Sequence, residues 1–294
     1  MKYYQLSVKM PEAPEVEVMN QEIDSDFKGK QLLNYNILKG KAKKKRPKLF
    51  LSFEKDLNNG IAILKDVTRR GKLMSLEFEF DIKGKKKTWW VCNYFGLHGS
   101  YRIDDDKIVP NYDKDNKNVH ISLEFKKTDS ESSYLNYYDT SGFGSSFTFY
   151  NNLDEYLKYL YKNAIDVFDE EFDIKTFKKN FEIVKLKPLS KFNIASILIN
   201  QGYLCSGIGN YLKCEILYEA KISPNRSIND INDEELEVLY KAIKKVCELH
   251  LSKEGRSEEH LKVYGKKVDA DGNEIKYEET QDGKKTYWVP EIQK

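Results

Sequence analysis

The stretch Pro11-Glu-Ala-Pro-Glu-Val places a residue that can act as an amine nucleophile beside carboxylates that can transfer protons. If translation starts at Met10 and that residue is then removed, Pro11 becomes the first residue and its secondary amine is free. An ordinary α-amino group has a pKa of about 8, so a useful fraction is neutral near pH 7. A neutral amine can attack a sugar carbon and form a Schiff base. Glu12 is placed to donate a proton to the sugar ring oxygen, and Glu15, one turn on, to orient the amine or a base.

This chemistry depends on where the working chain begins. In the sequence as written, Pro11 is an internal imide without a free amine. The nucleophile therefore requires residues 1–10 to be absent, and we expect Met10 to be the true start. If the extension is retained, the same residues form only a proline-flanked helix start.

A second candidate site lies at Gly207-Ile-Gly209-Asn210, between two helical patterns. Two glycines separated by one residue permit a tight turn and a close approach of the backbone to a partner. Asn210 is expected at the N-cap of the next helix. The free N–H groups and the positive dipole end at such a position suit a phosphate. An ordinary helix–turn–helix joint explains the same residues.

Other segments suggest contacts with a polyanion. Lys72 follows a Gly turn at the start of a predicted strand, where it could hold a phosphate or be a plain exposed charge. Phe95-Gly-Leu97-His-Gly99 suits either a hairpin turn or a loop tip whose Leu97 fills the space of an extracted base. The run KAKKKRPK (41–48) has six basic residues in eight, typical of a solvated loop, a phosphate contact or a nuclear-import signal.

The elements that must position these residues follow from apolar periodicity. A helix is predicted right after Pro14 and through Phe27, with acidic residues in its first turn. Short apolar or alternating runs up to Phe149 indicate an antiparallel sandwich or barrel. Strands are predicted at 32–38, 48–53, 60–70, 73–82, 88–95, 119–125 and 132–139. Helices are predicted at 153–163, 172–184, 191–201, 214–220 and 233–251, before a hairpin with turns at Asp271-Gly and Asp282-Gly.

Composition excludes several classes of protein. No run approaches the roughly 18 apolar residues of a membrane helix, and the first ten residues lack a secretory signal, so an intracellular protein is expected. The four cysteines are scattered, which indicates structural thiols and no zinc site. Asp269-Ala-Asp271-Gly lacks the ligand spacing of a calcium loop. The net charge of +2 does not by itself indicate a nucleic-acid partner.

Taken in order, seven motifs make the chain resemble the family of formamidopyrimidine-DNA glycosylase and endonuclease VIII, over about residues 11–293. The string PEAPEVEVM is similar to the Pro-Glu-x-Pro-Glu opening of that family. The other six are Arg69-Arg-Gly-Lys72, Phe95–Gly99, His120, Asp139–Gly144, Gly207–Asn210 with Glu215-Ile-Leu and Pro224, and Val263-Tyr-Gly-Lys with Thr286-Tyr-Trp-Val-Pro.

The resemblance implies roles for individual residues. Pro11 corresponds to the Schiff-base nucleophile, Glu12 to the proton donor and Lys72 to the lysine that grips the phosphate near the lesion in the lyase step. Asn210 corresponds to the phosphate-gripping Asn of the helix–two-turn–helix motif. The remaining implied positions are Glu15 in catalysis, Gly207, Gly209 and His120 in DNA binding, and Leu97 and Phe143 as void fillers. Lys284 or Lys285 stands where the family has an Arg in its finger.

Three departures from the family pattern bear on the implied activity. The finger lacks the cysteines of the zinc-bearing members, so it resembles the zincless finger of the endonuclease VIII-like branch, with no cofactor. Ser141-Gly142 replaces a paired Arg, which disfavours 8-oxoguanine and favours oxidised pyrimidines and formamidopyrimidines. Lys in place of the finger Arg loses a planar fork and weakens the phosphate grip.

The expected fold class is therefore α+β. Residues 1–10 form an extension, 11–162 a β-sandwich catalytic domain with a leading helix, 163–256 the helix–two-turn–helix domain and 257–294 the finger hairpin. The expected function is a glycosylase and AP lyase with β,δ-elimination, acting as a monomer in the cytoplasm or nucleus on double-stranded DNA with oxidised bases or abasic sites. A damaged-DNA binder with a blocked Pro11 is the alternative, and an RNA-binding or structural protein is a third class.

Overall fold

The computed structural model describes residues 11–39, 43–44, 46–96, 99–105, 118–140, 145–187, 192–253 and 260–294. The chain divides into two compact units. The first contains Pro11 and then Glu15–Leu160, and the second contains Glu12–Pro14 and Tyr161–Lys294.

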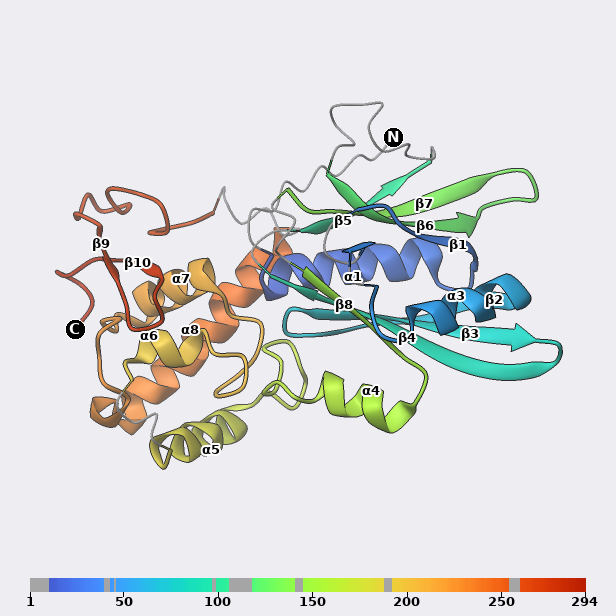
Figure 1. Cartoon of the computed structure of the whole chain (residues 1–294). Coiled ribbons are helices and arrows are strands. Elements are labelled where there is room, and N and C mark those ends of the chain that lie inside the picture. The colour runs from blue at the N-terminus through green and yellow to red at the C-terminus, as the bar shows by residue number, and fades with distance from the viewer. Residues whose placement is uncertain are drawn as a thin grey trace. The chain divides into compact units, whose positions relative to one another are not determined.

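The first unit is an antiparallel sheet with helices (Figure 1). Its helices are α1 (Ala13–Phe27), α3 (Phe50–Asn59) and α4 (Leu153–Leu160). Its strands are β1 (Gln31–Ile37), β2 (Ile61–Arg70), β3 (Leu73–Ile82), β4 (Lys85–Phe95), β5 (Ser100–Asp104), β6 (Val119–Lys126), β7 (Ser132–Tyr138) and β8 (Ser145–Tyr150). They are ordered β5-β7-β6-β1-β2-β3-β4-β8. This mixed fold confirms the predicted α+β class.

The sheet is folded over α1. Phe78 of β3 and Phe125 of β6 have ring centroids 6.4 Å apart. Their strands are separated by β1 and β2, so in a flat sheet they would lie about 14 Å apart. Figure 1 shows α1 between the two halves of the sheet. Buried α1 residues at helical spacing, from Val16 to Phe27, fill the space between them.

The prediction of a strand at 48–53 was wrong, because this segment begins α3. The six residues 48–53 fit both the repeat of a strand and the repeat of a helix. The apolar positions that follow decide between the two. Phe50 and Phe53 are buried with Leu57 packed beside them, at helical spacing, whereas Leu51 is 61% exposed. Strands β5 and β8 were not predicted, since both are short and rich in polar residues.

Phe53 is the centre of the aromatic core of the first unit. Its ring lies 5.2 Å from that of Phe149, 5.4 Å from that of Phe80 and 5.6 Å from that of Trp89, measured between centroids. The side chain is fully buried. Phe53 thus joins α3 to β3, β4 and β8.

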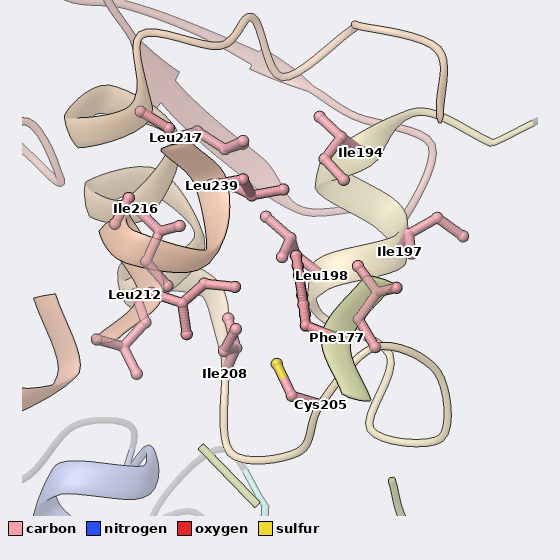
Figure 2. Close-up of a cluster of buried hydrophobic side chains, with 14 of the residues drawn as sticks. Phe177, Ile194, Ile197, Leu198, Cys205, Ile208, Leu212, Ile216, Leu217 and Leu239 are labelled. Carbon is pink, nitrogen blue, oxygen red and sulfur yellow. The ribbon is translucent and has the colours of Figure 1, made fainter. Parts of the chain in front are cut away.

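The second unit is helical and ends in a hairpin. Its helices are α5 (Ile174–Lys185), α6 (Ile194–Leu198), α7 (Asn210–Ala220) and α8 (Asp233–Ser252), with a 3-10 turn at Ile228–Asp230. Strands β9 (Lys276–Glu279) and β10 (Lys285–Trp288) pair in antiparallel register, which confirms the predicted hairpin. Figure 2 shows the core, where Leu212 and Ile216 of α7 lie among side chains of α5, α6 and α8.

Packing and hydrogen bonds hold the finger segment that ends the chain. Val263, Ile275 and Val289 form a buried cluster with Cys214 of α7. The Asp269 carboxylate accepts hydrogen bonds from the backbone N–H groups of Asp271 and Asn273 and from the Tyr218 hydroxyl. All four cysteines are free and buried, as expected of structural thiols. Within the described residues, no group of three potential metal ligands is found, and no helix is long and apolar enough to cross a membrane.

His250 makes the stability of this unit depend on pH. Burial, followed by the nearby His260 and Lys262, lowers the pKa of His250 from 6.5 to about 4. Between these two values the unfolded chain binds a proton that the folded chain does not, so the free energy of unfolding falls as pH drops below about 6.5. We expect His250→Phe, which keeps the contact with the Tyr211 ring, to flatten this dependence. Thermal unfolding between pH 7 and 5 measures it, and equal slopes for both proteins would contradict it.

Candidate active site

Glu12 closes the N-terminus of α7. Its Oε2 accepts hydrogen bonds from the backbone N–H groups of Gly209 at 2.6 Å and Leu212 at 3.2 Å, and its Oε1 from that of Tyr211 at 3.1 Å. The side chain is fully buried. These N–H groups have no partner within the helix, and a carboxylate at the positive dipole end is stabilised. Glu12 therefore acts as the cap of a helix almost 200 residues away in sequence, and it is held as an acceptor.

The predicted N-cap was wrong by one residue. Gly209 is the N-cap and makes no side-chain bond, because it has no side chain, and Asn210 is the first helical residue. The Asn210 amide Nδ2 instead donates to the backbone carbonyl of Lys285, at 3.0 Å. Asn210 thus connects α7 to the finger hairpin.

The glycine turn before α7 is built around protein partners. Gly207 has a φ of 107°, a left-handed conformation that favours glycine. Its N–H donates to the Gln201 side chain and its carbonyl accepts from the backbone N–H of Ala13. With the Gly209 N–H bound to Glu12, the backbone donors of the two glycines are engaged inside the unit. The backbone N–H groups of the two glycines are therefore not available to a phosphate, and the predicted contact would have to come from side chains such as that of Asn210.

In the first unit, a partly buried ion pair fixes the turn that carries Lys72. Arg69 Nε donates to Glu17 of α1 at 2.6 Å, and its guanidinium also donates to the carbonyl of Gly71 at 3.1 Å. The Lys72 carbonyl accepts from the backbone N–H of Phe95. Hydrogen bonds therefore hold the backbone carbonyls of Gly71 and Lys72, while the Lys72 side chain is partly exposed.

Pro11, Glu15 and His120 are the other predicted residues that the structure describes in this unit. Pro11 and Glu15 are buried. The His120 Nε2 lies 2.9 Å from the carbonyl of Asp139, so this nitrogen is the donor. Burial lowers the pKa of His120, although Asp139 opposes the shift. The neutral form is thereby favoured near pH 7.

The predicted void fillers Leu97 and Phe143 lie outside the described residues. The end of the Leu97 loop is visible at Gly99, which has a φ of 140°. A Cβ at Gly99 would stand 1.9 Å from the Tyr137 hydroxyl. Only glycine fits there, so this end of the loop has a fixed position on β7.

The two candidate finger lysines differ in their surroundings. The Lys285 ammonium lies 3.5 Å from the centroid of the Tyr277 ring and 5.3 Å from that of Tyr287. Lys284 is exposed, and in the described part of the chain no hydrogen bond or ion pair engages its side chain. Lys285 thus has aromatic partners, whereas the Lys284 ammonium remains open to a ligand.

Two buried charges on α7 were not predicted as functional. The Glu215 carboxylate accepts from the backbone N–H groups of residues 262–264, and burial raises its pKa. The Lys213 ammonium donates to Asp282 at 2.7 Å, and neither side chain is more than 7% exposed. Helical spacing offers the signal: α7 is apolar on the positions around Lys213, so a lysine there must find a buried partner.

Family models identify both parts of this chain. The formamidopyrimidine-DNA glycosylase N-terminal domain matches residues 10–146 and the H2TH domain of the same enzyme matches residues 164–260. The formamidopyrimidine-DNA glycosylase of Lactococcus lactis subsp. cremoris is 26% identical, with 87% of this chain and 89% of the relative covered. That of Cytobacillus firmus is 27% identical, with 88% and 89% covered.

Solved structures agree in fold. A complex of Lactococcus lactis Fpg with DNA containing an abasic site aligns with a TM-score of 0.74 at 21% identity, covering 96% of this chain and 99% of that one. A complex of MutM with DNA containing carbocyclic 8-oxo-G aligns with a TM-score of 0.75 at 23% identity, covering 97% and 100%. The fold and the two domains define a DNA-repair glycosylase. The chain belongs to the formamidopyrimidine-DNA glycosylase family.

Proposed function

We propose that this chain, when it begins at Pro11, is a bifunctional DNA glycosylase and AP lyase that removes oxidised bases from double-stranded DNA. The observation that carries the proposal is the placement of Glu12. Glu12 directly follows Pro11, the residue whose amine would react, in the sequence. Its carboxylate accepts hydrogen bonds from three backbone N–H groups, which fix its position. The glycosylase names of the relatives and the abasic-site DNA of the structural neighbours support the same activity.

The reaction needs a nucleophile and a proton donor. The neutral Pro11 amine attacks C1′ of the damaged nucleotide, and the bond to the base breaks as the base leaves with the electron pair and takes up a proton from water. The Glu12 carboxylate takes up the proton that the Pro11 amine loses after its attack and passes this proton to the sugar ring oxygen. The ring then opens and leaves a Schiff base between Pro11 and C1′. Loss of a proton from C2′ then expels the 3′ phosphate, and a second elimination expels the 5′ phosphate. Lys72 and Asn210 are proposed to hold the phosphates during these steps.

The proposed substrates are oxidised pyrimidines and formamidopyrimidines, as in the endonuclease VIII-like branch. Ser141-Gly142 in place of an Arg pair supports this preference, because the chain then offers no guanidinium there to face the orphaned base. Excision rates on duplexes with 5-hydroxycytosine, a formamidopyrimidine or 8-oxoguanine test it. Faster excision of 8-oxoguanine than of the other two would overturn it.

Borohydride trapping tests the mechanism. The chain expressed from Met10, with removal of that Met checked by mass, should form a covalent adduct with oxidised-base duplex DNA. The complete 294-residue chain should form none, because its Pro11 nitrogen is an amide. Absence of an adduct from the Pro11-initiated chain would rule out the mechanism.

A second candidate function is a damaged-DNA binder that does not cleave. A peptide bond between Met10 and Pro11, where it is kept, leaves no free amine at Pro11 and is the feature that would make the protein a binder. Intact-mass measurement on protein from its native source separates the two candidates. A mass that includes residues 1–9 supports the binder, and a mass that begins at Pro11 supports the enzyme.

Lys284, and not Lys285, is proposed as the finger cation that meets a phosphate. Its ammonium is exposed and without a side-chain partner among the described residues, whereas that of Lys285 lies on the Tyr277 ring. Loss of one phosphate contact reduces the slope of log K against log salt concentration by about 1. We therefore expect this reduction in Lys284→Ala, measured on duplex DNA with a tetrahydrofuran abasic analogue. Lys285→Ala should keep the slope of the parent chain, and the reverse pattern would contradict the assignment.

The same proposal includes a monomer that works without metal inside the cell, in the cytoplasm or the nucleus. The domain bounds given above, with a catalytic domain at 11–162, a DNA-binding domain at 163–256 and a finger at 257–294, belong to it too. Metal analysis of the purified protein and sedimentation at micromolar concentration test the first two points. One bound zinc per chain, or a stable dimer, would overturn them.

A further inference from the structure

Lys213 is a basic residue buried in the core of the second unit. It lies on α7 and is fully buried. An unpaired ammonium in such a place is very costly, so its partners must compensate. Its Nζ donates to Asp282 Oδ2 at 2.7 Å and lies 3.5 Å from the Thr280 hydroxyl. Both partners belong to the turn between β9 and β10.

Asp282 links the Lys213 ammonium to the backbone of the turn. While Oδ2 accepts from Lys213, Oδ1 accepts from the Thr280 hydroxyl at 2.6 Å and from the backbone N–H of Lys284 at 3.1 Å. The Thr280 and Thr286 hydroxyls lie 2.7 Å apart, across the base of the turn. One carboxylate thus connects α7 to the residue that carries the exposed Lys284 side chain.

A second contact from α7 reaches the same turn. Asn210 and Lys213 are three residues apart, so their side chains share one face of the helix. Asn210 donates to the carbonyl of Lys285 at 3.0 Å, and Lys213 binds Asp282. The first turn of α7 therefore holds the finger turn on both sides of Lys284.

We propose that Lys213 and Asp282 are positioning residues that set the finger turn against α7, so that Lys284 and Asn210 bind one backbone of the damaged DNA together. The proposal rests on the proposed DNA-repair function. The pair does not touch the DNA. It fixes the backbone of Lys284, so that the flexible side chain of this lysine starts from a set position near Asn210.

A purely structural role is the competing explanation, since breaking any buried ion pair destabilises a protein. The two explanations differ in what happens to Lys284. If the pair only contributes stability, a folded variant without it keeps the phosphate contact of Lys284. If the pair positions the turn, the variant loses that contact although Lys284 is present.

A double-mutant cycle on the complete chain tests the proposal. The variants are Lys213→Met, Lys284→Ala and the two combined, and the probe is duplex DNA with a tetrahydrofuran abasic analogue. We expect each single variant to reduce the slope of log K against log salt concentration by about 1, and the combination to reduce it no further. Asp282→Asn should act like Lys213→Met, and Lys213→Arg should restore the slope of the parent chain.

The matched control is Lys178→Met, which removes a lysine from the exposed pair with Glu237 in the same unit. It should keep the parent slope. Circular dichroism confirms folding, and if Lys213→Met unfolds, Asp282→Asn takes its place in the cycle. A folded Lys213→Met with the parent slope, or a combined loss of about 2, would overturn the proposal.

Hydrogen exchange separates this inference from the proposed function. In Lys213→Met, the amides of residues 282–286 should exchange faster, whereas those of α5 should keep their rates. If the parent chain does not prefer abasic duplex DNA over undamaged duplex DNA, the proposed function is wrong. Independently of that result, unchanged exchange at residues 282–286 in Lys213→Met would show that the pair does not hold the turn.

Discussion

Replacing Glu12 by Gln in the chain that begins at Pro11 should lower the rate of base excision by about 10²- to 10⁴-fold, the usual contribution of a positioned proton donor. The amide has no acidic proton to give to the sugar ring oxygen. On a duplex with a preformed abasic site the loss should be smaller, because the base has already left and the sugar already opens to an aldehyde. Single-turnover rates on both substrates measure the difference.

The structural role of Glu12 must be separated from the chemical one. The Gln amide group turns donors toward the N–H groups of Gly209 and Leu212, so the cap weakens by about 1 kcal/mol. Thermal unfolding records that cost. Glu234→Gln, an exposed acidic residue in the first turn of α8, is the matched control and should retain full activity. An equal loss on both substrates would show that Glu12 supports the fold alone.

Phe53→Ala should reduce the free energy of unfolding of the first unit by about 3–5 kcal/mol. The ring is fully buried among Phe80, Trp89 and Phe149, and its removal leaves a cavity that these large side chains cannot fill. Urea unfolding followed by tryptophan fluorescence reports this change, since Trp89 lies against the site.

Leu51→Ala on the same helix is the matched control. That side chain is 61% exposed, so its loss should change the free energy of unfolding by less than about 0.5 kcal/mol. If the two variants unfold at the same urea concentration, Phe53 does not hold the aromatic core together.

The spacing of apolar residues predicted the longer helices, such as α1 and α8, and the turn residues predicted the finger hairpin. Six residues at 48–53 were too few to distinguish a strand from the first turns of α3. The contacts that organise the site were harder to predict from the sequence, because they join residues that lie far apart along the chain. Nothing in the sequence near Asn210 reveals that Glu12 would cap α7 and that Gly209 would be the N-cap.

The buried pair of Lys213 and Asp282 is a second contact that local sequence patterns could not predict. Both residues are visible in the sequence, and helical spacing puts Lys213 among apolar neighbours. The identity of its partner, 69 residues away, depends on how the hairpin docks on the helix. A charge on an apolar helix indicates that a partner exists, and only the tertiary structure identifies it.

The three residues Glu12–Pro14 fold with the second unit, although the chain on both sides of them belongs to the first. The helical unit is therefore assembled from two separate pieces of sequence. A fragment of residues 161–294 produced alone would carry α7 with the N–H groups of Gly209, Tyr211 and Leu212 exposed. Such a fragment would lack the carboxylate that caps α7, so we expect it to be less stable than the same unit in the whole chain.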